Sequence, residues 1–149
     1  MKILVINGPN LNLLGQREPG VYGSGTYREL TDAIERFADG IGAQIEIVQH
    51  NCEGGIIDAI HGAPGTADCI IINPGAYTHY SYAIYDALKA VDVPAVEVHL
   101  SNIAAREEFR SRSVTAAACL GQISGLGFAG YIAAMSFFVS RLSGGDGHG

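Results

Sequence analysis

The residues whose types most clearly suggest catalysis lie in a glycine-rich stretch near the amino terminus. This stretch, residues 8–25, is called the lid here, and it contains Arg17 and Tyr22. A phenol is a poor base at neutral pH because its ordinary pKa is about 10. A guanidinium beside it keeps its own charge and stabilises the phenolate by Coulombic attraction. The pair therefore predicts a tyrosinate general base on a segment long enough to fold over a site.

Polar residues also follow three short apolar runs, each at the point where the run ends. They are residues 7–10 (NGPN), 73–79 (NPGAYTH) and 99–102 (HLSN). One such change of character is ordinary turn chemistry, because Asn and Gly tolerate turn dihedral angles. Ligands of open α/β sheets, however, bind beyond the carboxyl ends of the strands. Three polar segments meeting at one sheet edge therefore predict a functional site there.

The elements that would position these residues alternate between strand and helix. Short apolar runs rich in β-branched residues predict parallel strands, and they cover residues 3–6, 45–48, 69–72, 95–98 and, more weakly, 118–124. Helical patterns lie between and after them, at residues 26–38, 53–60, 81–90 and 128–142. Thr26 and Glu29 have the spacing of a capping box at the first of these helices.

This alternation predicts an α/β protein with helices on both faces of a parallel sheet. For five strands the expected arrangement is a flavodoxin-like three-layer sandwich with strand order 2-1-3-4-5. The length of 149 residues fits one domain. We expect a single catalytic domain over residues 1–142 and a disordered glycine-rich tail over residues 143–149.

Composition and charge exclude several classes of protein. The formal charge is −6, and the two lysines, Lys2 and Lys89, lie outside any basic cluster, which argues against nucleic-acid binding. No apolar run reaches the length of a membrane span. Charged residues make up only 16%, against about 25% in typical soluble domains. Together with the apolar helix at residues 128–142, this predicts that much of the surface is buried between subunits.

The three cysteines have no metal-type spacing, and neither do the histidines. A reducing cytoplasmic location is the simplest interpretation of an odd number of cysteines. Cys69 and Cys119 lie beside apolar residues, so we expect both to be small core residues. The sequence thus predicts a cytoplasmic protein that needs no metal.

This chain lacks the residues that other kinds of site on similar folds require. A phosphoryl-accepting receiver domain needs acidic residues after the first and third strands, where this chain has Asn7 and Asn73. The first turn is not the Ser/Thr-rich phosphate loop of a flavin site. The chain has no G-x-S-x-G elbow and no G-x-G-x-x-G after the first strand, which excludes an α/β-hydrolase and leaves a dinucleotide site unsupported.

Five motifs together carry a close resemblance to the type II 3-dehydroquinate dehydratases. They are NGPNLNLLGQREPGVYG, QHNCEGGIIDAIH, IINPGAYTHYSYAIYDAL, VPAVEVHLSNIAAREEFRSRS and GLGFAGY. The resemblance runs from about residue 2 to residue 142. The chain departs from the family pattern at Cys52, where a polar residue or His is more usual, and this position lies outside the expected chemistry.

The resemblance implies reversible loss of water from 3-dehydroquinate to give 3-dehydroshikimate. In this family the reaction is an anti elimination through an enolate, with no metal and no cofactor. The resemblance also implies a homododecamer built from trimers. The sequence leaves open whether the enzyme serves aromatic amino acid biosynthesis through the shikimate pathway or quinate breakdown.

The resemblance also assigns roles by position. Tyr22 is the general base, His99 is the general acid and Arg17 keeps Tyr22 ionised. Asn10 holds a water near the enolate oxygen, and Glu97 orients His99. The residues implied in substrate binding are Asn73, His79, the Leu100–Ser101 backbone, Arg110 and, from a neighbouring subunit, Asp86.

The residue chemistry agrees with these roles. Imidazole is a suitable proton donor for a departing hydroxyl group. Neither lysine lies in a motif near the expected site, so the Schiff-base route of the type I enzymes is poorly supported. For Arg106 we expect pairing with Glu97, Glu107 or Glu108 rather than substrate contact. The alternatives are a non-catalytic flavodoxin-like binding module and a lyase for a different cyclic polyhydroxy acid.

Overall fold

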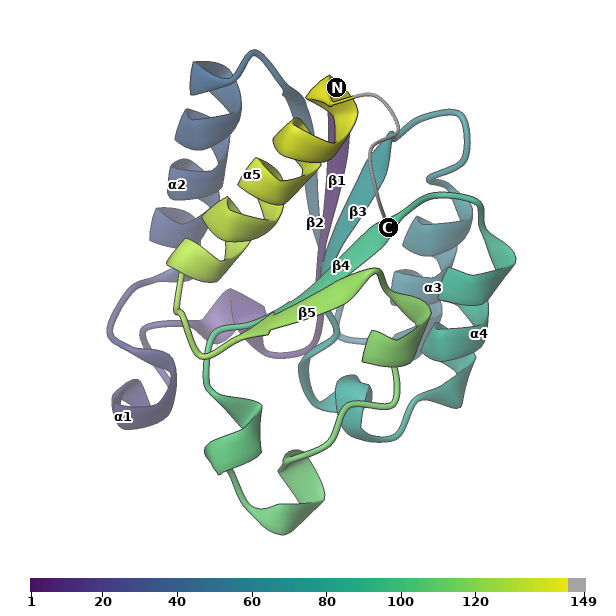
Figure 1. Cartoon of the computed structure of the whole chain (residues 1–149). Coiled ribbons are helices and arrows are strands. Elements are labelled where there is room, and N and C mark those ends of the chain that lie inside the picture. Colours follow the sequence, from purple (N-terminus) through teal and green to yellow (C-terminus); the bar gives the residue numbers. More distant parts are fainter. Residues whose placement is uncertain (145–149) are drawn as a thin grey trace.

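A computed structural model describes residues 1–144 of the chain and contains one sheet of five parallel strands. The strands are β1 (Lys2–Asn7), β2 (Gln44–Gln49), β3 (Cys69–Asn73), β4 (Ala95–His99) and β5 (Gly121–Ser124). Their order across the sheet is β2-β1-β3-β4-β5 (Figure 1). The predicted flavodoxin-like order is therefore confirmed.

Two pairs of helices cover the two faces of this sheet. The first pair is α2 (Tyr27–Gly40) and α5 (Ala129–Ser143), and the second is α3 (Glu53–His61) and α4 (Tyr82–Ala90). The two pairs lie on opposite sides of the strands, as Figure 1 shows. Each pair contributes to its own apolar core against the sheet. Because β3 is covered on both faces, all its residues are buried, which explains its continuous apolar run.

Local sequence signals fix where the first of these helices begins. The Thr26 side chain accepts a hydrogen bond from the Glu29 backbone N–H at 3.1 Å. The Glu29 carboxylate in turn accepts from the Thr26 backbone N–H at 2.9 Å. This is the predicted capping box, and it satisfies two N–H groups that a helix start leaves unpaired.

The last strand begins later than the sequence predicts. Residues 118–124 were expected to be extended, but Ala116–Ala118 form a 3₁₀ turn and β5 begins at Gly121. Three consecutive alanines favour a helical turn, since they lack the branched side chains that stabilise strands. The prediction of a strand was therefore wrong for residues 118–120.

Within this single chain the final helix buries one face. Tyr131, Met135 and Phe138 are buried in the core, whereas Phe137 and Leu142 are exposed in this chain. The helix ends at Ser143, so the predicted tail begins slightly later than expected. Residues 145–149 of that tail lie outside the described residues.

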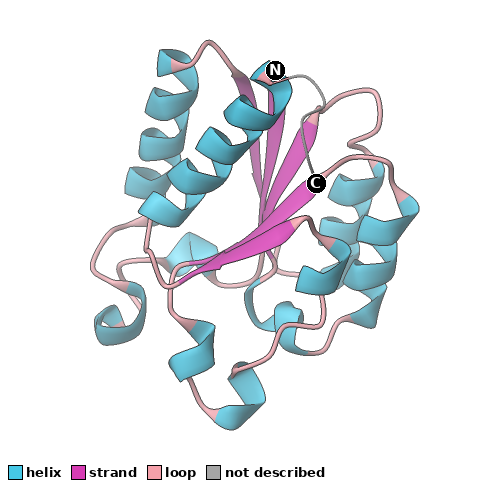
Figure 2. Cartoon of the chain, viewed as in Figure 1, coloured by secondary structure: helices cyan, strands magenta, loops and turns pink. Residues whose placement is uncertain are grey.

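The lid contains two short helical turns, η1 (Leu11–Leu13) and α1 (Pro19–Tyr22), where the sequence predicted a loop. Pro19 suits the first position of α1 because its fixed φ angle matches a helix and it needs no N–H partner there. Figure 2 shows short turns and loops gathered at the lower edge of the sheet, where the strands end. Within residues 1–144, no helix has the length and apolar character needed to cross a membrane.

Candidate active site

A pocket opens at the carboxyl ends of β1, β3 and β4. Its lining comes from the lid and from the segments that follow β1, β3 and β4: Pro9, Asn10, Leu11, Arg17, Tyr22, Asn73, Gly75, Ala76, His79, His99, Leu100, Ser101, Ile103, Arg106 and Arg110. The sheet therefore brings together the three polar segments that the sequence placed beyond strand ends.

One wall of the pocket, called the base wall here, consists of Tyr22 with Arg17 and Arg106. The guanidinium carbon of Arg17 lies 5.0 Å from the Tyr22 ring centroid, and that of Arg106 lies 5.4 Å from it. Arg106 Nη1 also donates to the Tyr22 hydroxyl oxygen at 3.4 Å and to Ser101 Oγ at 3.3 Å. Two guanidinium groups therefore lie beside one phenol ring.

A second wall, the acid wall, consists of His99 and the carboxylate beneath it. His99 Nε2 lies 2.9 Å from Glu97 Oε2, and both residues are buried. Residues 97 and 99 lie on the same face of β4 because side chains along a strand alternate between faces. The carboxylate can therefore fix the orientation of the imidazole ring.

Glu97 is held by hydrogen bonds from several segments. Besides His99, its carboxylate accepts from Thr78 Oγ1 (3.1 Å), Ser113 Oγ (2.7 Å), Gln122 Nε2 (3.0 Å) and Thr115 Oγ1. Burial alone would raise the pKa of this carboxyl. The hydrogen bonds from His99, Thr115 and Ser113, with the charge of His99, outweigh burial and hold the pKa below its ordinary value.

The floor of the pocket is made by tightly packed backbone. A side chain at Gly8 would overlap the backbone carbonyl of Pro74. Gly75 adopts a positive φ of 62°, and a side chain there would press on Pro9. Glycine is therefore needed at both positions for the turns after β1 and β3 to meet.

The residue pattern and the fold both agree with known proteins. The family model described as Dehydroquinase class II matches residues 1–139. The 3-dehydroquinate dehydratase of Clostridium acetobutylicum is 54% identical over 143 residues, which is 96% of this chain and 99% of that protein. The chain belongs to the class II dehydroquinase family. The Caldicellulosiruptor bescii 3-dehydroquinate dehydratase is 61% identical over 135 residues, covering 90% of this chain and 93% of that protein.

Solved structures support the same membership. The type II dehydroquinase of Butyrivibrio crossotus superposes on this class II dehydroquinase with a TM-score of 0.92 at 52% identity, covering 93% of this chain and 97% of that one. A dehydratase-like protein from Bifidobacterium longum matches with a TM-score of 0.72 at 30% identity, covering 96% and 98%. The predicted family resemblance is confirmed.

Most residues that the sequence singled out line the pocket of this class II dehydroquinase. Those that do so are Asn10, Arg17, Tyr22, Asn73, His79, His99, Leu100, Ser101 and Arg110. Glu97 lies behind His99 rather than at the pocket surface. Asp86 is exposed on α4 and is not among the lining residues, so its expected role requires a neighbouring subunit.

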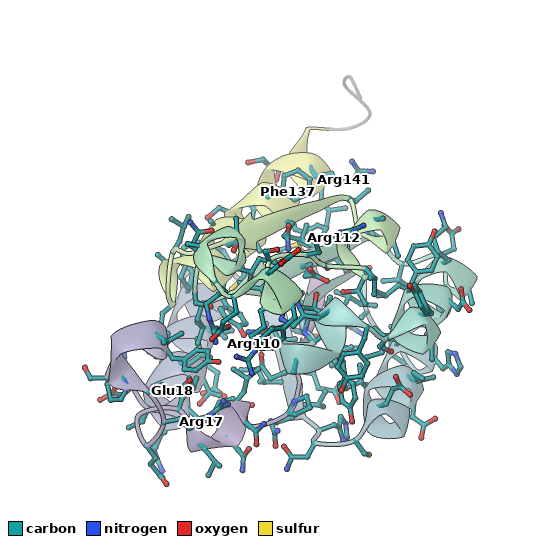
Figure 3. The ribbon with its side chains drawn as sticks, turned by 90° about the horizontal axis from the view of Figure 1, so that it is seen from below. Arg17, Glu18, Arg110, Arg112, Phe137 and Arg141 are labelled. Atoms are coloured by element: carbon teal, nitrogen blue, oxygen red, sulfur yellow. The ribbon has the colours of Figure 1, made fainter. Side chains whose placement is uncertain are left out.

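Two of the lining residues are held by neighbours from the segment after β4. His79 Nδ1 lies 2.7 Å from the backbone carbonyl oxygen of Arg112. Arg110 Nη1 donates to Glu107 Oε2 at 3.0 Å. Figure 3 labels Arg17 and Arg110, which reach the pocket from segments far apart in the sequence.

Arg106 was incompletely interpreted from the sequence. It does approach a glutamate, with Nε 3.8 Å from Glu107 Oε2, as expected. It also lines the pocket and contacts Tyr22 and Ser101. The motif AREEFR favours ion pairs near in sequence, and nothing in it places Arg106 beside a residue 84 positions away. Over residues 1–144, His, Cys, Asp and Glu form no group of three or more that could hold a metal ion.

Proposed function

We propose that this class II dehydroquinase converts 3-dehydroquinate reversibly into 3-dehydroshikimate by anti elimination of water. The observation that carries the proposal is the pairing of two walls in one pocket: a phenol flanked by two guanidinium groups, and an imidazole backed by a buried carboxylate. The family membership supplies the substrate. The mechanism that we propose for these residues uses neither a metal nor a cofactor.

In the first step the Tyr22 phenolate removes a proton from C2 of the substrate. The electron pair of the broken C–H bond moves into the neighbouring C3 carbonyl and gives an enolate. Arg17 and Arg106 stabilise the phenolate before the transfer. A water held by Asn10, which lines the pocket, stabilises the negative charge that develops on the enolate oxygen.

In the second step the enolate re-forms the C3 carbonyl, the electron pair at C2 forms the C1–C2 double bond, and the C1–O bond breaks. His99 gives its proton to the departing oxygen, so the leaving group is water. Glu97 holds the imidazole ring in place and stabilises its charged form before the transfer. Tyr22 then loses its proton to solvent, and the neutral His99 takes one up, so that both groups return to their starting forms.

The substrate is a carboxylate, whereas the chain has a formal charge of −6. Local cations must therefore overcome the overall field. Arg110 and His79 line the pocket together with Asn73 and the Leu100–Ser101 backbone. We assign these groups to the carboxylate and the ring hydroxyls of the substrate.

We further propose a cytoplasmic homododecamer built from trimers, in which Asp86 completes the pocket of a neighbouring subunit. Exposed apolar side chains support burial between subunits, among them Leu126 and two residues of α5, Phe137 and Leu142; Figure 3 labels Phe137. Light scattering after size-exclusion chromatography measures the assembly directly. A monomeric mass under native conditions would contradict it.

The decisive test is an assay for the ultraviolet absorbance of the conjugated enone of 3-dehydroshikimate. We expect turnover of 3-dehydroquinate by the wild type and a loss of about 10³-fold in kcat for Tyr22→Phe. Tyr82→Phe is the matched control, since that ring is 72% exposed and lies outside the pocket lining. Equal turnover by wild type and Tyr22→Phe would refute the base assignment, and an inactive wild type would refute the function.

A further inference from the structure

The motif GLGFAGY ends in Tyr131, a residue that the proposed mechanism does not use. Tyr131 lies on α5, and its ring is fully buried in the core between α5, α2 and the sheet. Its hydroxyl group nevertheless reaches the ends of two strands. It donates to Asn7 Oδ1 at 2.7 Å and accepts from Asn73 Nδ2 at 3.1 Å.

The two asparagines are partners in the sheet. Asn7 ends β1 and Asn73 ends β3, and the two residues lie opposite each other in the parallel register. Both are buried. One phenol therefore bridges two amide side chains directly beneath the pocket, which Asn73 lines.

These hydrogen bonds form a chain in which the donor and the acceptor of each bond can be assigned. The Gly75 backbone N–H donates to Asn73 Oδ1 at 3.1 Å, so the amide nitrogen of Asn73 must face Tyr131. The hydroxyl hydrogen of Tyr131 then points to Asn7, and Asn7 Nδ2 donates to the Tyr27 hydroxyl at 3.4 Å. A backbone N–H can only donate, and this fixes the amide orientation along the chain.

We infer that Tyr131 is a positioning residue that holds the Asn73 amide with one N–H available for a substrate hydroxyl. An amide nitrogen carries two hydrogens, and within the described residues Asn73 Nδ2 uses one of them, toward Tyr131. Without that partner the buried amide would turn to find another acceptor, since a buried donor is costly to leave unpaired. This inference rests on the proposed function, because Asn73 would then bind the hydroxylated ring of 3-dehydroquinate.

The expected kinetic signature separates positioning from simple stability. Tyr131→Phe keeps the ring in the core and removes only the hydroxyl. Asn73 is expected to bind the ring equally in the ground state and the transition state. KM for 3-dehydroquinate should therefore rise about tenfold while kcat changes less than about twofold. Asn73→Ala combined with Tyr131→Phe should give the same KM as Asn73→Ala alone, because the tyrosine acts through the amide.

Met135→Leu is the matched control, since Met135 is buried on the same helix and none of the polar contacts above involves it. It should lower the thermal midpoint of unfolding and leave KM unchanged. If Tyr131→Phe does not fold, Asn7→Ala gives an equivalent test. That variant keeps the phenol but removes the acceptor of its hydroxyl hydrogen, and KM should again rise with kcat retained.

Each outcome has one meaning. Wild-type turnover with an unchanged KM in Tyr131→Phe overturns the inference and leaves the proposed function intact. A fall in kcat without a change in KM also overturns it, and so does additivity of the two substitutions. A wild type without turnover overturns the proposed function first.

Discussion

The two walls of the pocket are built in different ways. The acid wall rests on a β-strand, and its carboxylate at Glu97 is fully buried and held by four donors from three other segments as well as by His99. The base wall rests on α1, a four-residue helix in the lid, and Tyr22 is only half-buried. The Tyr22 hydroxyl has a long contact of 3.4 Å to Arg106. Activity and stability should therefore be coupled on the acid wall and separable on the base wall.

The largest expected effect tests whether the acid wall takes part in the reaction at all. His99→Ala removes the proton donor and should lower kcat by about 10²–10⁴-fold in the enone assay. His61→Ala is the control, because that histidine is exposed at the end of α3. A His99→Ala enzyme with near-normal kcat would remove this wall from the mechanism.

A smaller effect is expected on the base wall. Arg17→Ala removes one of the two cations beside the Tyr22 ring, and at a distance of 5.0 Å this should lower kcat by about 100-fold. The thermal midpoint should stay close to wild type, because Arg17 lies in the lid. Arg28→Ala, on the exposed side of α2, serves as the control. A large drop in the thermal midpoint would show that the two walls do not differ in this respect.

The pH dependence of stability tests the buried carboxylate of the acid wall. The pKa of Glu97 is lower in the folded protein than its ordinary value of 4.5. Its contribution to stability is therefore present above pH 4.5 and is lost as the pH falls through the folded pKa. The free energy of unfolding, measured with urea, should decrease over that range.

Thr115→Val removes one hydrogen bond to Glu97 and should reduce this pH dependence. At neutral pH the variant should be less stable by about 2 kcal/mol, because the lost bond was made to a buried charge. Thr31→Val is the control, since the Thr31 hydroxyl donates to the Arg28 carbonyl within α2, away from Glu97. Equal pH slopes for wild type and Thr115→Val would contradict the assignment.

The smallest effect concerns cysteine reactivity. Burial raises the pKa of Cys69 to about 12, and burial with the nearby Glu97 charge does the same for Cys119. Cys52 is exposed at the start of α3. A thiol reagent at pH 8 should therefore modify Cys52 rapidly and the other two slowly, because the thiolate is the reactive form. Rapid reaction at Cys119, whose Sγ lies 3.8 Å from the Thr115 carbonyl, would indicate that the acid wall opens readily. Cys52→Ser should abolish the fast phase.

The sequence predicted the sheet and its polar edge well because both depend on local patterns. A continuous apolar run such as residues 69–72 predicts a strand that is buried on both faces. Two features depended on long-range contacts and were missed. Arg106 meets Tyr22 only after the lid folds back over the segment that follows β4. The bridge from Tyr131 to Asn7 and Asn73 joins a helix to two strands, and no periodicity reports such a contact.

The close approach at Gly8 has a consequence for how this pocket can change. Since any side chain there would collide with Pro74, the distance between the turns after β1 and β3 cannot adapt to a larger ligand. A change in substrate selectivity must therefore come from substitutions in the lid and in residues 100–113, while the floor of the pocket stays constant. A library of variants at position 8 should yield misfolded chains, whereas diversity in those two segments should yield folded enzymes with altered preferences.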